Sequence, residues 1–301
     1  MRLLPLFPLL PLLPLIAAVP THLAHSFIAA NSSAFGALIE GAAVDRHGFL
    51  YAVGYNSSKT AVGQAYARQQ LFFEDTERPS AWFNGVRFAV DPHGVQEAYL
   101  GDVANHRVVR VRDVGGGRRF AHSEVFCQSP AFLQPNDLAF AHAARRVFLS
   151  GMRFATDSAV GDGDLWTCDS AGTATKLGSF HRTNGIEVSP DEKTLYLSEA
   201  VNRHGRVVSN VIHAFDLDAD AGTISNARVL VDFAALDDSA ANDVDGMRAD
   251  SQGNLYVTRW GAGKIAKISP AGALLAYIAL ANIAEVTNLE FAGPSGRDLY
   301  A

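Results

Sequence analysis

The chain has 301 residues, of which 48% are hydrophobic and 19% charged, so it can bury a full core in one large domain or two small ones. This composition excludes a disordered chain. The formal net charge is −6, and the charges are spread along the sequence without a basic run. This distribution argues against nucleic acid as a partner.

The first 25 residues have the layout of a secretory signal peptide: Arg2, then a leucine-rich run, then small residues. Prolines spaced three residues apart interrupt the helix that a membrane anchor would need, so we expect secretion and no membrane contact after cleavage. Cleavage is predicted between Ala18 and Ser26. The remaining chain, residues 26–301, is predicted to be one domain.

Two further features bear on the compartment. Asn31 and Asn56 each begin an Asn-X-Ser triplet, which predicts a glycoprotein. Cys127 and Cys168 are the two cysteines of the chain. They allow one disulfide in an oxidising compartment, and two buried free thiols are the alternative.

A short apolar motif with a central aromatic residue recurs along the chain, as FLYAVG, EAYLGD, RVFLSG, TLYLSE, NLYVTR and DLYA. Successive aromatics are 44 to 60 residues apart; they are Tyr51, Tyr99, Phe148, Tyr196, Tyr256 and Tyr300. Each unit divides into short strands separated by turn signals such as DPHG and SPDE. This period predicts an all-β, six-bladed β-propeller with four-stranded antiparallel blades.

The third unit shows the strand pattern well, as NDLAFAH, RRVFLSG, DLWTCD and TATKLGSF. The longest spacing is in the fourth unit, where residues 201–223 are interpreted as a longer loop. The last unit stops after DLYA, so the last blade is predicted to be incomplete. A strand within residues 26–40 is expected to fill one edge of it, and the edge that stays open predicts a truncated gene product or poor solubility.

A polar residue precedes each aromatic motif by a nearly constant distance, at the start of an apolar stretch. These residues are Glu40, Asn84, Asn136, Asn184, Asp245 and Asn288. A single Asn-Gly or Asp-Gly is more simply a hairpin turn. Recurrence in every unit instead favours a ring of side chains at one mouth of the central channel, since the first strand of each blade lines that channel.

Carboxylate and amide oxygens in such a ring are hard ligands, which suit Ca²⁺ or Mg²⁺ and fit Zn²⁺ poorly without His or Cys. The sequence therefore predicts one divalent cation, with Ca²⁺ favoured and Mg²⁺, Mn²⁺ and Zn²⁺ as alternatives. His181, three residues before Asn184, is a candidate proton carrier, although a surface or packed histidine is the simpler interpretation.

The stretches RTNGIEVSPDEKTLYLSEA, VDGMRADSQGNLYVTRWGAGKIAKISPAG and VTNLEFAGPSGRDLY, in this order, resemble the senescence marker protein/gluconolactonase/luciferin-regenerating-enzyme-like family. The resemblance extends over roughly residues 36–301. It implies a six-bladed propeller with one divalent cation in the channel. It also implies that Glu40, Asn184 and Asp245 hold the metal and that Asn136 contacts the substrate.

Gln134 stands where sugar-lactone hydrolases of the family often carry an arginine, which argues against an aldonolactone substrate. We predict a secreted, metal-dependent hydrolase of lactones or related esters, with Asn136 and Gln134 binding the substrate. In this mechanism the cation polarises the carbonyl and Asp245 is the general base that activates water. The alternatives are a non-catalytic binding propeller with a structural cation, or a strictosidine-synthase-like propeller.

Overall fold

The structure is a computed structural model that describes residues 19–24, 38–54, 61–64, 70–75, 80–113, 120–293 and 295–301. The predicted glycosylation sites, Asn31 and Asn56, lie outside these residues, as do residues 1–18 of the predicted signal peptide. In the described part, regular structure is almost entirely β-strand, which confirms the all-β prediction. The one helix found there is α1 (Phe233–Asp237), and no described helix is long and apolar enough to span a bilayer.

Four antiparallel sheets each contain four strands that are adjacent in chain order. The first sheet comprises β2 (Ile39–Val44), β3 (Leu50–Gly54), β4 (Ala61–Gln64) and β5 (Gln70–Glu74). The second comprises β6 (Phe83–Val90), β7 (Gln96–Asp102), β8 (Arg107–Asp113) and β9 (Phe120–Gln128). The third comprises β10 (Gln134–Ala141), β11 (Arg146–Met152), β12 (Gly163–Cys168) and β13 (Ala174–Phe180). The fourth comprises β14 (Arg182–Val188), β15 (Thr194–Arg203), β16 (Arg206–Asp218) and β17 (Thr223–Asp232).

The last two sheets depart from this pattern. The fifth comprises β18 (Asp243–Ala249), β19 (Leu255–Trp260), β20 (Lys264–Ile268) and β21 (Leu274–Leu280). The N-terminal strand β1 (Thr21–Ala24) extends it by pairing parallel to β21. The sixth sheet has two described strands, β22 (Glu290–Ala292) and β23 (Asp298–Tyr300). The edge strand was expected within residues 26–40, of which residues 26–37 lie outside the described residues.

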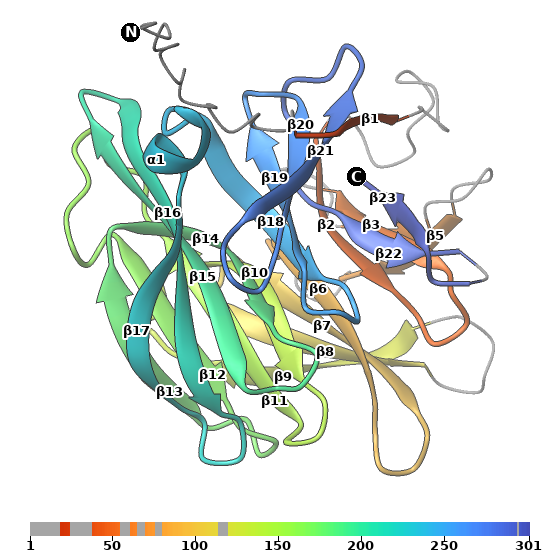
Figure 1. Ribbon diagram of the computed structural model, residues 1–301. Coiled ribbons are helices and arrows are strands. Elements are labelled where there is room, and N and C mark those ends of the chain that lie inside the picture. Colours follow the sequence, from red (N-terminus) through yellow and green to blue (C-terminus); the bar gives the residue numbers. More distant parts are fainter. Residues whose placement is uncertain are drawn as a thin grey trace, which may run out of the picture.

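The first strands of successive sheets contact one another, so the sheets are arranged around a common axis. β2 contacts β6, β6 contacts β10, β10 contacts β14, β14 contacts β18, and β22 contacts β2. In Figure 1 the strands β6, β10, β14 and β18 lie toward the middle of the molecule, and β5, β13 and β17 lie toward its periphery. The first strands therefore line the interior, as in a propeller.

The recurring aromatic residues lie on the second strand of their sheets and join neighbouring sheets. The ring of Tyr99 is 5.0 Å from that of Phe140 in the third sheet, and the ring of Tyr51 is 4.8 Å from that of Phe88 in the second. Tyr51 and Tyr99 are each 1% exposed. The repeated motif thus supplies an aromatic contact between sheets, which explains its spacing of one per sheet.

Two observations correct or resolve the sequence-based expectations. The insertion around residues 201–223 is mostly not a loop, because it extends the β15–β16 hairpin; its several Val and Ile residues favour strand. Cys127 and Cys168 form a disulfide that links β9 of the second sheet to β12 of the third.

Candidate functional site

Five of the six recurring polar residues lie near the start of the first strand of a sheet, and each strand has an irregular register there. The residues are Glu40 on β2, Asn84 on β6, Asn136 on β10, Asn184 on β14 and Asp245 on β18. A β-bulge bends the strand and redirects a side chain, and bulges are common next to functional sites. Asn288 lies just before β22, and its Oδ1 accepts a hydrogen bond from the backbone N–H of Leu289.

The glycine that follows most of these polar residues permits the close approach of adjacent first strands. A Cβ on Gly185 would come within 2.1 Å of the carbonyl oxygen of Asp245. A Cβ on Gly41, where φ is +53°, would come within 2.3 Å of the carbonyl oxygen of Asn84. The Asn-Gly and Asp-Gly pairs are therefore packing requirements of this ring rather than hairpin turns.

Asp245 lies among other carboxylates and beside Asn184. Burial raises the pKa of Asp245 well above its usual value, and the nearby charges of Glu40, Asp243 and Asp137 raise it further. A hydrogen bond from the Asn184 side chain opposes this shift. Glu40, Asn184 and Asp245, from three different sheets, are thus brought into one electrostatic environment.

The pKa of Glu40 is raised for the same physical reasons as that of Asp245. Burial raises its pKa to about 8, with a further contribution from the charge of Asp137, while a backbone hydrogen bond at Gly41 lowers it. Buried carboxylates this close together repel each other unless a proton or a cation lies between them. The raised pKa values of Glu40 and Asp245 therefore reflect burial together with negative charges that nothing nearby balances.

Several buried oxygens of the same region have no hydrogen-bond partner among the described residues. They are Oδ1 of Asn84, Oδ1 of Asn184 and Oδ2 of Asp137. An unpaired buried oxygen costs about 1–3 kcal/mol, so each such atom needs a ligand or a water molecule. These residues fit a hard divalent cation, which takes carboxylate and amide oxygens. Within the described ranges, no three or more His, Cys, Asp or Glu side chains form a metal-binding group by themselves.

A network of buried ion pairs, the channel ion network, also lines the first strands. Its members are Arg87, Asp137, Glu187, Arg248 and Glu290. Arg87 Nη2 lies 3.3 Å from Asp137 Oδ1 and 3.9 Å from Glu187 Oε2. Arg248 Nη1 lies 3.7 Å from Glu187 Oε2, and its Nε donates to Glu290 Oε2 at 2.9 Å. Burial raises the pKa of Glu187 to about 7.

Hydroxyl groups on the second strands hold the first strands in place. Ser150 Oγ donates to the carbonyl of Asn184 in the next sheet, and Ser198 Oγ accepts from the N–H of Asn184 at 3.2 Å. Thr258 Oγ1 donates to the carbonyl of Gly246, next to Asp245, at 3.0 Å. Asn184 and Asp245 are therefore positioned by side chains from behind, as preorganised sites require.

The remaining predicted residues lie at the same end of the fold. Gln134 is exposed and begins β10, and Asn136 is half-buried two residues further along. His181 immediately precedes β14, and its Nδ1 lies 3.1 Å from the carbonyl oxygen of Ser158. Because this contact fixes the ring against a loop, a packed histidine is the better description of His181 than a free proton carrier.

Sequence reasoning missed the channel ion network and the supporting hydroxyls. Asp137 occupies the place that glycine holds in four other units, so this departure from the repeat was its signal. Arg87, Glu187 and Arg248 each stand three residues after a recurring polar residue, between two apolar neighbours. The hydroxyls each stand two residues after a recurring aromatic; they are Ser150, Ser198 and Thr258.

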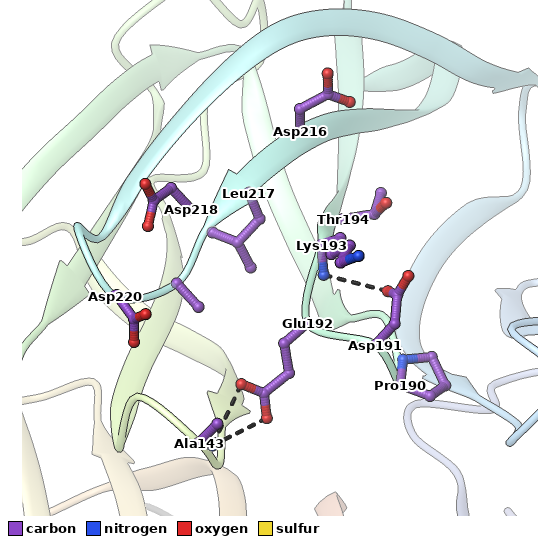
Figure 2. A pocket seen from close by; sticks show the side chains of 11 residues that line it. Ala143, Pro190, Asp191, Glu192, Lys193, Thr194, Asp216, Leu217, Asp218 and Asp220 are labelled. Atoms are coloured by element: carbon purple, nitrogen blue, oxygen red, sulfur yellow. Dashed lines mark hydrogen bonds between the residues drawn. The ribbon is translucent and has the colours of Figure 1, made fainter.

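A separate pocket opens at the other end of β14, beyond the turn that joins β14 to β15 (Figure 2). It is lined largely by acidic side chains, among them Asp191, Glu192, Asp216 and Asp218. Glu192 accepts a hydrogen bond from the backbone N–H of Ala143 at 3.1 Å, and Asp218 accepts from that of Ala221. These carboxylates stabilise turns, and the pocket contains none of the candidate ligands.

Known proteins resemble the chain both in sequence and in fold. The sequence profile of the SMP-30/Gluconolactonase/LRE-like region matches residues 94–301. Regucalcin of Xenopus laevis is 29% identical over 118 residues, which are 39% of this chain and 36% of that protein. The chain thus matches about a third of the length of this curated relative.

Solved structures share the fold over most of the chain. Regucalcin from Agrobacterium tumefaciens, described as a calcium-binding protein, has a TM-score of 0.66 at 17% identity and covers 86% of this chain and 79% of its own. A gluconolactonase from Xanthomonas campestris has a TM-score of 0.59 at 19% identity, and the match covers 84% of this chain and 79% of the gluconolactonase chain. At this level of identity the likeness shows the fold, which is that of a β-propeller.

Proposed function

Because the chain belongs to the SMP-30/gluconolactonase/luciferin-regenerating-enzyme-like family, we propose that it is a divalent-metal-dependent hydrolase of lactones or related esters. One observation carries the proposal: Glu40, Asn184 and Asp245 converge from three sheets, with raised carboxyl pKa values and unpartnered buried oxygens beside them. A gluconolactonase and a calcium-binding regucalcin among the proteins of the same fold support lactone chemistry and Ca²⁺.

The described residues have distinct roles in the proposed reaction. Glu40, Asn184 and Asp245 would hold the cation, which when bound supplies Lewis-acid polarisation of a carbonyl and acidifies water. Asp245 takes the proton of the attacking water as that water's oxygen bonds to the carbonyl carbon. The same proton then goes to the ring oxygen as the acyl C–O bond breaks, which leaves a hydroxy acid. Asn136 and Gln134 lie on the adjacent strand and orient the substrate.

We further propose that the six sheets are the six blades of one propeller. Support comes from the sequence of contacts β2–β6–β10–β14–β18 and from the contact of β22 with β2. Arg248 on β18 joins the two ends of this sequence, because it donates to the carbonyl of Ala42 on β2 and pairs with Glu290 on β22. The candidate ligands then lie around one channel.

Metal removal tests the function. Protein stripped with a chelator should lose hydrolysis of lactones of varied size, and Ca²⁺ should restore it better than Mg²⁺, Mn²⁺ or Zn²⁺, each added alone. Oxygen ligands without His or Cys disfavour Zn²⁺, and the calcium-binding protein of the same fold supports Ca²⁺ over Mg²⁺ and Mn²⁺. Since the cation-free pKa of Glu40 is about 8, Ca²⁺ binding at pH 7 should also release protons, measurable by calorimetry in two buffers. Full activity after stripping would contradict the proposal.

We also propose that the protein is secreted, with a signal peptide removed before Thr21. The disulfide between Cys127 and Cys168 supports an oxidising compartment. β1 supports the position of cleavage, because Thr21 pairs with Tyr277 and the carbonyl of Pro20 accepts from the N–H of Tyr277 at 2.9 Å. N-terminal sequencing of the exported protein should find a start at residue 19 or 20. A start at Ser26 would remove this strand and contradict the assignment.

A further inference from the structure

Exposed hydrophobic side chains gather around the mouth of the channel where the candidate ligands lie. We call this set the apolar rim: Leu38, Ile39, Phe154, Val160, Trp260 and Ile283. All six belong to strand ends or loops at the end of the fold where the first strands begin. Several other exposed hydrophobics lie singly on outer strands, as is ordinary for a soluble protein; they are Val125, Val229 and Leu275.

Phe154 is the most exposed member of the rim, at 72%. The guanidinium carbon of Arg182 lies 5.6 Å from the centre of its ring. Arg182 is two residues before Asn184 on β14, and it is held in turn by an ion pair with Asp243. The buried side chain of Arg182, close to the candidate ligand Asn184, therefore lies against one face of the Phe154 ring. The rest of this ring is exposed to solvent.

Trp260 and Ile39 extend the rim on the other sides of the mouth. Trp260 is paired across β18 and β19 with Asp243, two residues before Asp245. Ile39 immediately precedes Glu40, and its carbonyl accepts from Thr287 Oγ1 at 2.9 Å. Ile39 thus adjoins Glu40 in the chain, Trp260 is paired with a residue two before Asp245, and Phe154 contacts a residue two before Asn184.

Polar groups of the loop that carries Phe154, residues 153–162, are already used in holding that loop. Asp157 accepts from the N–H of His204 at 2.8 Å, and Ser158 exchanges hydrogen bonds with the backbone of Asn202. Arg203 donates to the carbonyl of Ser158 at 2.8 Å. These contacts hold the loop in place and leave the side chains of Phe154 and Val160 exposed.

We infer that the substrate is a lactone or ester with an apolar alkyl or aryl substituent, which the rim contacts while the carbonyl lies at the candidate ligands. This inference rests on the proposed function. A polyhydroxylated lactone would gain little from contact with Phe154 and Ile39, which offer its hydroxyls neither a donor nor an acceptor in their side chains. An alkyl chain instead gains from every methylene that it buries there.

The test is a series of γ-lactones from γ-butyrolactone to γ-decalactone, with glucono-δ-lactone for comparison, in the metal-loaded protein. The value of kcat/KM should rise by about two- to fourfold for each added methylene until the chain leaves the rim. Phe154→Ala and Trp260→Ala should each flatten this slope, so that the ratio for the longest and shortest substrates falls by about tenfold. Val229→Ala, which removes an exposed hydrophobic on β17, should leave the ratio unchanged.

A flat slope, or a preference for glucono-δ-lactone, would overturn the inference while leaving the hydrolase intact. If no lactone is hydrolysed, the proposed function fails. The preference of the apolar rim for alkyl substituents is then tested by binding alone. Calorimetric titration of γ-decalactone and γ-butyrolactone then gives the result. Tighter binding of the longer chain that is lost in Phe154→Ala supports the rim, and equal binding overturns it.

Discussion

Asp245→Asn is expected to lower lactone turnover by about a hundredfold or more, even at saturating metal. The substitution keeps an oxygen in place but removes both a negative charge and the proton acceptor. Without a cation, burial and the nearby charge of Glu40 raise the pKa of Asp245; a bound cation would oppose this shift and keep Asp245 in the carboxylate form that a general base needs. Metal affinity should fall as well, because one of the two ligand charges is lost.

Glu40→Gln separates ligation from base catalysis. It removes a charge at the same site but no base, so excess metal should restore part of its activity, whereas Asp245→Asn should stay inactive when saturated. Asp220→Asn makes the same chemical change on an exposed turn at the other end of the fold and should behave as the unaltered protein. Equal recovery of the two site variants would remove the base role from Asp245. Unchanged Ca²⁺ binding in both would exclude the channel as the metal site.

Arg248→Met should lower the free energy of unfolding by about 3–5 kcal/mol, because breaking a buried ion pair leaves a charge without compensation. Arg248 is 4% exposed, pairs with Glu290 and Glu187, and donates to the carbonyl of Ala42. It therefore joins its own sheet to three others, including the first and sixth sheets at the two ends of the series. Denaturant unfolding measures the loss.

Two further variants make this result specific. Adding Glu290→Gln to Arg248→Met neutralises one of the carboxylates left behind, so part of the stability should return. Arg228→Met breaks an ion pair with Asp216 in which both side chains are about half exposed, and it should cost less than about 1 kcal/mol. A loss as small in Arg248→Met as in Arg228→Met would show that the channel ion network contributes little to ring closure.

The repeat by itself determined the fold class and the strands of most sheets. In the third sheet, the predicted strands agree with β10 to β13 within one or two residues. This is so because turn signals and alternating apolar residues are local, and each sheet is built from strands that follow one another in the chain. The insertion in the fourth unit was misread as a loop because its length dominated the interpretation, although its Val and Ile pattern favours strand.

The sequence alone also selected the polar residues at the starts of the first strands, including Glu40, Asn184 and Asp245. This was possible because the same position in each sequence repeat lies at the same point of each sheet, here the start of its first strand. The roles of these residues remain predictions that the variants above test.

Only the tertiary structure decided which side chains meet across the ring. Arg248 and Ala42 are 206 residues apart, and no local pattern relates them. Asp137, Glu187 and Arg87 belong to three different sheets, and they pair because the first strands converge on one axis. The apolar rim has the same origin, since Phe154 and Trp260 come from loops and strand ends whose position depends on how the sheets pack. Contacts between units that lie far apart in the chain follow from closure of the ring, which the repeat implies but does not describe residue by residue.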